Sequence, residues 1–260
     1  FGYARYQLEA TGTPAQSYVK GTLGFEEIRA HLMGEETYGV YPLRADRTLK
    51  LSSIHVGIPW RRVVENTKNT GFLTLLEERV QHYSREILEK SREFGIPAYL
   101  ENSGERDRRV WFFFEEFIPL ELAERFLNNL LDKVRAPLSD ISSSLVLGIK
   151  GKGIGYEDHP VMLPLGLNRK TGMRCFFVNE YGDPYEDQLL WIRKIRPISR
   201  REIQEFIKIA EKRRFDWLSE GTLDPLKRLE KNCSVIEEII RKARSGRMLS
   251  HEEKVVIFFT

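Results

Sequence analysis

The chain has 260 residues, with 41 Lys and Arg against 38 Asp and Glu, a formal net charge of +3 and 41% hydrophobic residues. This apolar content excludes a disordered protein and suffices for one large domain or two small ones. No apolar run approaches the roughly 20 residues of a membrane helix. Two distant cysteines favour a reducing compartment, so we expect a cytoplasmic protein without a membrane partner.

The first elements expected along the chain are short. Apolar residues at helical spacing predict a helix over 25–33 that ends at Gly34. Strands are expected over 38–43 and 48–56, and the turn around Asp46 would join them as a hairpin. Alternation in the second strand predicts that only one of its faces is buried.

The middle of the chain carries the clearest periodicity. A helix is expected over 72–94, with Gly95 as its C-terminal stop. Strands over 97–101 and 109–115 follow, and the continuous apolar run of the second indicates a central strand buried on both faces. With a further helix over 119–134, this order of elements predicts an α+β fold in which helices cover a sheet.

The second half of the chain is less regular. The segment 137–158 is rich in Ser and Gly and is expected to be a loop. Strands over 161–165 and 173–178 would form a second hairpin. A capped helix over 199–214 would complete the main body.

A linker over 218–231, which contains Gly and Pro, predicts a boundary between two parts of the chain. We therefore expect a main domain over 1–217 and a helical extension over 218–260. Two short helices are expected in the extension, over about 234–245 and 250–259. Because the chain lacks an initiator Met and ends in apolar residues, we interpret it as a piece of a longer polypeptide.

Residues typical of catalysis or metal binding are scattered. The five histidines have no second His or Cys at ligand spacing, so they predict no metal site. Basic residues recur in expected loops, where they could contact nucleic-acid phosphates. The alternative, solvated faces of a charge-rich protein, stays open. The basic residues concerned are Arg61, Arg62, Arg106, Arg108, Arg109, Lys150, Lys152, Arg169, Lys170, Arg193, Lys194 and Arg196.

Four motifs follow one another along the chain. They are Gly39-Val40-Tyr41-Pro42-Leu43 with Asp46 and Thr48, Phe94-Gly95-Ile96-Pro97-Ala98, Val110-Trp111-Phe112-Phe113-Phe114-Glu115-Glu116, and Leu163-Pro164-Leu165-Gly166-Leu167-Asn168-Arg169-Lys170-Thr171-Gly172. Together they resemble the archaeo-eukaryotic primase superfamily over most of residues 25–214. Within it, the likeness is to primase-polymerases of mobile-element conflict systems and to CRISPR-associated primase-polymerases. The resemblance implies a primase small-subunit-like (RRM-like) sheet and two-metal nucleotidyl transfer by a D-x-D pair and a third carboxylate.

The residues at the family's catalytic positions differ in this chain. The D-x-D positions fall on His55, Val56 and Gly57. Glycine has no ligand atom, and neutral imidazole is a poor ligand for Mg²⁺ or Mn²⁺. Arg109 stands at the family's nucleotide-binding His, although Ser103 of the same motif remains.

The two remaining motifs are altered as well. The third carboxylate is expected within 139–147, where Asp140 is the only acid. The hairpin motif has Met162 and Asn168 in place of a basic residue and a His, but it retains Arg169 and Lys170. Because the apolar framework persists while the chemistry does not, we expect a primase fold that has lost catalysis.

The segment from Cys233 to Thr260 resembles the start of a primase-large-subunit-like helical region. In such relatives the first Cys joins later cysteines in holding a metal or an iron–sulfur centre. Those later cysteines are absent from this chain, so Cys233 is interpreted as a buried thiol.

Three functions are compatible with this sequence. The preferred one is a non-catalytic primase-like domain or subunit of a replication, mobile-element or CRISPR-related complex. It would bind single-stranded DNA or RNA, or a catalytic primase, a helicase or another subunit, without a cofactor or metal. Its groove would contain Arg61, Arg62, Ser103, Arg109, Lys150, Lys152, Arg169 and Lys170, with Trp60 and Tyr156 for base stacking.

The two alternatives belong to other classes. One is a purely structural assembly subunit, whose apolar C-terminal end would dock a partner. The other is an active primase-polymerase in which His55, Asp140 and Asp158 would hold Mg²⁺ or Mn²⁺ at an altered metal site.

Overall fold

The computed structural model describes residues 2–10, 12–134, 137, 140–147, 149–150, 157–219 and 242. The chain divides into two compact units, residues 1–208 and 209–260, and the boundary lies within helix α6 (Arg200–Ser219). The domain boundary expected at residues 217 and 218 stays a prediction. The linker and the two short helices expected beyond residue 218 lie outside the described residues, as does Cys233.

A five-stranded antiparallel sheet forms the centre of the first unit, with strand order β11-β5-β6-β4-β7. Its middle strand is β6, so the central position expected for the apolar run is confirmed. Val110, Trp111, Phe112 and Phe114 are all buried. The strands are β4 (Thr48–Gly57), β5 (Tyr99–Asn102), β6 (Arg108–Pro119), β7 (Ser142–Val146) and β11 (Phe176–Val178).

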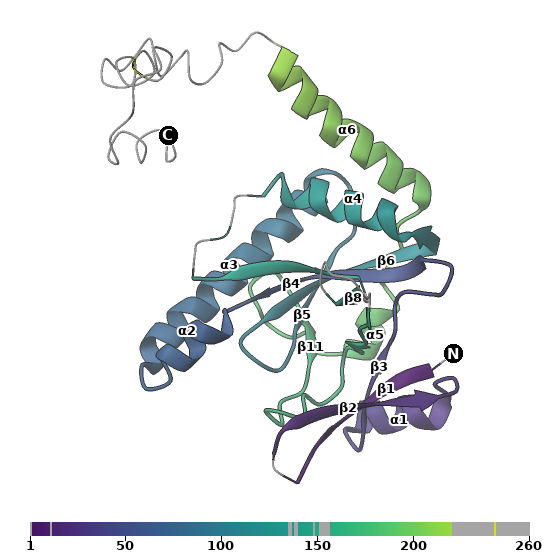
Figure 1. Cartoon of the computed structure of the whole chain (residues 1–260), viewed down its shortest axis with the longest axis vertical. Helices are drawn as coiled ribbons and strands as arrows, with labels where there is room; N and C mark the ends of the chain where they lie inside the picture. Colours follow the sequence, from purple (N-terminus) through teal and green to yellow (C-terminus); the bar gives the residue numbers. More distant parts are fainter. Residues whose placement is uncertain are drawn as a thin grey trace. The chain divides into compact units, whose positions relative to one another are not determined.

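Helices α3 (Thr70–Glu93) and α4 (Leu120–Leu131) cover one face of this sheet (Figure 1). The predicted helical spacing is confirmed, because the buried side chains of α3 recur on one side of the helix. Phe126 of α4 packs edge to face on Phe112 of β6, at a centroid distance of 5.5 Å. The α+β prediction, a sheet covered by helices, is therefore confirmed.

A second sheet lies on the other side of the large one, with order β10-β3-β1-β2 (Figure 1). Trp111 and Phe177 of the large sheet form a buried cluster with Val161 and Leu165. No strand was expected before residue 25, so the sequence analysis did not predict β1 and β2. The strands are β1 (Gly2–Leu8), β2 (Pro14–Lys20), β3 (Thr37–Val40) and β10 (Val161–Met162).

The first expected hairpin is wrong, and the second is found only at its turn, where Leu167 and Arg174 form an antiparallel bridge. β3 pairs with β1 and β10, whereas β4 pairs with β6 and β7, so the two strands belong to different sheets. Likewise β10 pairs with β3 and β11 pairs with β5. Since β4 is an inner strand, Ser52, Ser53 and Ile54 are all buried, and the expectation of one buried face is also wrong.

The segment 137–158, expected to be a loop, contains β7 and the short antiparallel pair β8 (Ile149–Lys150) and β9 (Glu157–Asp158). β7 has few apolar residues and pairs along one edge of β4, which explains why its sequence does not indicate a strand. The remaining helices are α1 (Phe25–Met33), α2 (Trp60–Glu65) and α5 (Gln188–Ile192). None of the helices among the described residues is long and apolar enough to cross a membrane.

Candidate nucleic-acid binding site

Polar side chains gather on the face of the large sheet that α3 and α4 leave open. His55 of β4 lies opposite Arg109 of β6, and Arg109 lies opposite Glu101 of β5. Register partners in neighbouring strands project to the same face. Since side chains alternate along a strand, Gly57 belongs to this face as well. The sheet therefore brings together residues that are more than 40 positions apart.

Asp107, at the turn that leads into β6, pairs with His55. Nε2 of His55 lies 2.7 Å from Oδ2 of Asp107, and the Ser103 hydroxyl donates a hydrogen bond to the other carboxylate oxygen. Burial alone would raise the pKa of Asp107. The hydrogen bonds from His55 and Ser103, with the charges of His55 and Arg109, outweigh burial and lower this pKa to about 2. Asp107 is therefore a carboxylate that accepts from both neighbours.

The buried Glu101 and the partly buried Arg109 form a second pair beside the first. Oε2 of Glu101 accepts a hydrogen bond of 2.6 Å from Nε1 of Trp111 and lies 3.8 Å from Nη1 of Arg109. Burial raises the pKa of Glu101 to about 7, against the opposing charge of Arg109 and the Trp111 hydrogen bond. Oε1 of Glu101 and Nη1 of Arg109 have no hydrogen-bond partner within the described residues. Nη1 of Arg109 is therefore enclosed beside Glu101 and interacts with it by charge rather than by a hydrogen bond.

A cavity of about 340 Å³ opens above these pairs. Its described lining includes three cationic side chains, Arg109, Arg169 and Lys170, and contains no carboxylate. Arg169 is held by Thr37, whose Oγ1 accepts from its Nε at 2.8 Å. The other polar lining residues are Tyr6, Gln7, Gln16, His55, His159 and Asn168. The cavity is therefore suited to an anionic ligand.

A smaller hollow of about 170 Å³ lies on the other side of His55. Gly57, Asp107 and Trp60 line it, and the Trp60 side chain is 68% exposed. The Lys170 ammonium lies 5.2 Å from the centre of the Trp60 ring, which is cation–π distance. Lys170 and Trp60 thus connect the two hollows along one surface.

Comparison with known protein families identifies the family of this chain. The family described as TOTE conflict system, Archaeo-Eukaryotic Primase domain, matches residues 4–206. The chain belongs to this primase family. No match was found among curated proteins. The resemblance inferred from the four motifs is confirmed, and the domain is a primase-like domain of a conflict system.

Some of the expected site residues of this primase domain lie together. His55, Arg109, Arg169 and Lys170 all line the larger cavity. Ser103 is buried, and it contacts Asp107 instead of the cavity. We infer that Ser103 supports the site from below, while the cationic residues face the ligand.

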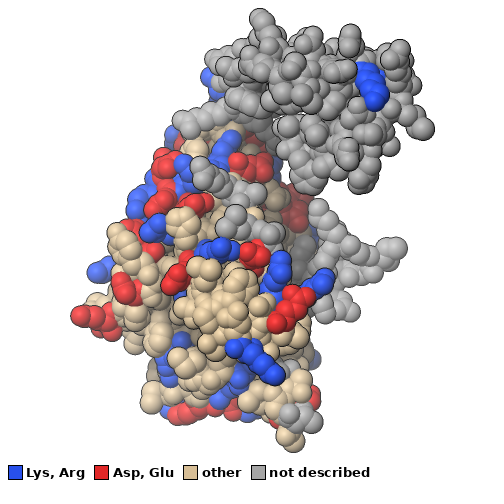
Figure 2. All heavy atoms as spheres, turned by 90° about the vertical axis from the view of Figure 1, so that its left-hand side faces the viewer, with Lys and Arg blue, Asp and Glu red and all other residues tan. Residues whose placement is uncertain are grey.

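The two arginines of α2 are placed differently. Arg61 pairs with Glu65 at 2.7 Å, and Arg62 lies 3.3 Å from Asp140. Neither arginine lines the cavity. Figure 2 shows acidic and basic side chains interspersed over one face of the molecule, in keeping with the solvated-surface alternative for residues of this kind. The side chain of Lys150, and the whole of Lys152 and Tyr156, lie outside the described residues.

Gly57 shows how far this site differs from a D-x-D metal site. A Cβ atom at Gly57 would lie 2.8 Å from Cε1 of His55 and 3.1 Å from Cβ of Asp107. A carboxylate cannot be added there unless His55 moves. His55, at the position expected for the first metal ligand, therefore fills the space above Gly57, the position expected for the second.

Asp140, expected at the third carboxylate position, is engaged elsewhere. Its oxygens lie 2.7 Å from Arg79 and 3.3 Å from Arg62. The residues opposite His55 and Gly57 on β7 are Ser144 and Ser142. Over the part of the chain that the structure describes, no group of three His, Cys, Asp or Glu side chains is placed to hold a metal ion. The side chain of Asp158 lies outside that part.

Sequence reasoning missed Asp107 and Glu101. Asp107 stands in a polar turn, where acids are ordinary, and its pairing depends on the register between β4 and β6. Glu101 carries a clearer signal, because it is a charged residue that directly follows Tyr99 and Leu100 in a strand. Tyr6 and His159 could not be found without the second sheet, which places both at the cavity.

Proposed function

We propose that this primase-like domain binds single-stranded nucleic acid in the His55–Arg109 cavity and does not catalyse nucleotide transfer. One observation supports the proposal: Arg109, Arg169 and Lys170 converge on one cavity. By the motif spacing, His55 and Gly57 are the residues expected at the family's metal-ligand pair. Cations that face a concave site bind phosphate, and their charge does not depend on a metal ion.

The shape of the surface favours a single strand. A cavity of about 340 Å³ can hold one nucleotide unit but cannot accept the rigid cylinder of a duplex. Trp60, exposed beside Lys170, offers a ring on which a neighbouring base can stack. In this arrangement the phosphate would enter the cavity and the next base would lie over the indole.

The binding half of the proposal is tested with a labelled single-stranded oligonucleotide and fluorescence anisotropy at several salt concentrations. We expect Lys170→Ala to weaken binding several-fold and to reduce the slope of log affinity against log salt by about 1. Lys90→Ala is the matched control. Lys170 pairs with Glu105 and Lys90 pairs with Glu93, and both lysines are partly exposed, but Lys90 lies away from the cavity. Equal effects of the two variants would refute the site.

The catalytic half is tested by nucleotide incorporation on primed and unprimed single-stranded templates with Mg²⁺ and Mn²⁺. We expect no incorporation by protein shown to be folded. Incorporation that is lost in Asp107→Asn would refute this half and support an active enzyme with an altered metal site at His55 and Asp107. The structural-assembly alternative is tested by comparing the size in solution of the chain with and without residues 222–260.

A further inference from the structure

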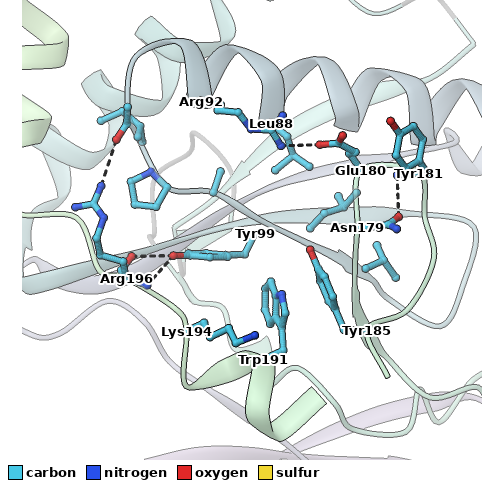
Figure 3. A pocket seen from close by; sticks show the side chains of 16 residues that line it. Leu88, Arg92, Tyr99, Asn179, Glu180, Tyr181, Tyr185, Trp191, Lys194 and Arg196 are labelled. Carbon is cyan, nitrogen blue, oxygen red and sulfur yellow. Dashed lines mark hydrogen bonds and ion pairs between the residues drawn. The ribbon is translucent and has the colours of Figure 1, made fainter. Parts of the chain in front are cut away.

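A second cavity, of about 530 Å³, lies where β5 begins and β11 ends (Figure 3). The C-terminal part of α3 contributes Arg92, and the segment that follows β11 contributes Tyr185, Trp191 and Lys194. None of the residues that line the His55–Arg109 cavity lines this one. Its volume falls within the range of small-molecule sites in proteins.

One wall of this cavity is aromatic. The side chains of Tyr99, Trp191 and Tyr185 lie in a row, with Arg196 beside Tyr99 (Figure 3). Tyr185 stacks on Trp191 at a centroid distance of 4.5 Å and an interplanar angle of 21°, and Trp191 packs on the buried Phe177 at 4.6 Å. The row is thus anchored in the core, and a planar ligand that stacks on Tyr185 would extend it.

The position of the wall is fixed by backbone contacts. The Tyr99 hydroxyl accepts a hydrogen bond of 2.7 Å from the Arg196 amide and lies 3.1 Å from the Arg196 carbonyl oxygen, to which it donates. This pair of bonds holds Arg196 at the rim before any ligand enters. A preformed aromatic wall loses little side-chain entropy on binding.

The rim of the cavity is cationic. Arg92, Lys194 and Arg196 line it, against one carboxylate, Glu180, which pairs with Arg92. Arg196 pairs with Glu202 outside the cavity. The side chain of Lys194 lies at the rim beside the aromatic row (Figure 3). Its ammonium group has no ion-pair partner within the described chain. This excess of positive charge favours a ligand that carries an anion next to its ring.

We propose that this cavity binds a nucleotide, either free or as the terminal residue of a strand. The base would stack on Tyr185, and the phosphate would contact Lys194. Because stacking does not read the hydrogen-bonding edge of a base, the site would accept different bases with similar affinity. The proposal does not depend on binding at the His55–Arg109 cavity.

The test uses the full chain and the indole N–H signals of its tryptophans in NMR spectra, with the Trp191 signal assigned from Trp191→Phe. Adenosine 5′-monophosphate is the probe, and ribose 5-phosphate is the control that lacks a base. We expect the monophosphate to shift the Trp191 signal and the sugar phosphate to leave it unchanged. A shift of the Trp60 signal alone would overturn the proposal, since Trp60 reports the other site.

Charge variants provide an independent measurement. We expect Lys194→Ala to weaken monophosphate binding about tenfold, because a hydrogen bond to a charged group is lost. Arg193→Ala removes the same charge one residue away and outside the cavity lining, and should change affinity less than about twofold. Lys170→Ala should leave the Trp191 shift intact. Equal weakening by the Lys194 and Arg193 variants would refute the site.

The source of the nucleotide is decided by a further comparison. If a 5′-phosphorylated oligonucleotide shifts the Trp191 signal at concentrations similar to the monophosphate, the cavity binds the end of a strand. If only the monophosphate does so, the ligand is free nucleotide. Absence of a Trp191 shift with either probe at millimolar concentration would overturn the proposal, whatever the anisotropy measurements show for the other site.

Discussion

Nε2 of His55 and Oδ2 of Asp107 lie 2.7 Å apart, although 52 residues separate the two in sequence. This pair occupies the place where the primase family is expected to hold its first metal ligand. Asp107, whose pKa lies near 2, accepts hydrogen bonds from His55 and Ser103. The site thus retains an acidic side chain, but that side chain is committed to an internal contact.

The first prediction concerns Asp107. We expect Asp107→Asn to lower the free energy of unfolding by about 2 kcal/mol near neutral pH. The folded pKa of about 2 lies below the ordinary 3.8. The stability that ionised Asp107 contributes is therefore complete above pH 3.8 and is lost as the pH falls toward 2. Urea unfolding between about pH 6 and pH 3 should show the difference between the two proteins shrinking. Glu116→Gln, an exposed change on β6, should show no such trend.

The second prediction concerns Glu101, whose pKa is shifted in the opposite direction from that of Asp107. Its folded pKa of about 7 lies above the ordinary 4.5, so ionisation of the unfolded chain destabilises the fold as pH rises between these values. Gln at this position keeps an acceptor for Trp111 and does not titrate. We expect the stability of Glu101→Gln relative to the natural chain to increase from about pH 4.5 to pH 7. A difference that stays constant over that interval would contradict the assigned pKa.

The third prediction concerns His31, a buried residue in the last turn of α1. The Tyr38 amide donates to its Nδ1 at 3.0 Å, and its Nε2 donates to the Pro164 carbonyl oxygen at 3.0 Å. Burial, with the nearby charges of Arg174 and Arg169, lowers the pKa of His31 despite its carbonyl contacts. Stability should therefore be lost as pH falls below the ordinary value of 6.5. The loss should be smaller in His31→Gln, as measured by thermal unfolding at several pH values.

The fourth prediction tests the crowding between His55 and Gly57. Gly57→Asp should destabilise the domain by about 1–3 kcal/mol, because its Cβ would contact the His55 ring. The same change in a His55→Ala background should cost less. A double-mutant cycle measured by urea unfolding gives the coupling between the two positions. Additive effects would show that His55 is not what excludes a side chain from position 57.

Local patterns predicted the helices and several strands of this fold. The helix expected over 72–94 agrees with α3 because its apolar spacing, its Asn69 cap and the glycine after it all favour one helix. The strand over 109–115 was identified as central from composition alone, since only a strand covered on both faces tolerates such a run. Both conclusions rest on interactions within short segments.

Strand pairing could not be predicted in the same way. Nothing in residues 37–40 indicates a partner at 161–162, and the sequence distance hides the second sheet entirely. Contacts within the site could not be predicted for the same reason. His55, Arg109, Arg169 and Lys170 were found from the motifs, but the contact between His55 and Asp107 follows from the register between β4 and β6. Arg61 was grouped with them because the sequence does not show that it lies on a separate helix surface.

The pairing of β3 with β10 also constrains the order in which the chain can become functional. A ribosome releases β1 and β3 long before β10, and the Tyr6 hydroxyl finds its acceptor, the Pro160 carbonyl oxygen, 154 residues later. Such distant contacts raise the contact order and slow folding. The cavity combines Tyr6 with Lys170, so a nascent chain has no complete binding surface until nearly all of the domain has been synthesised.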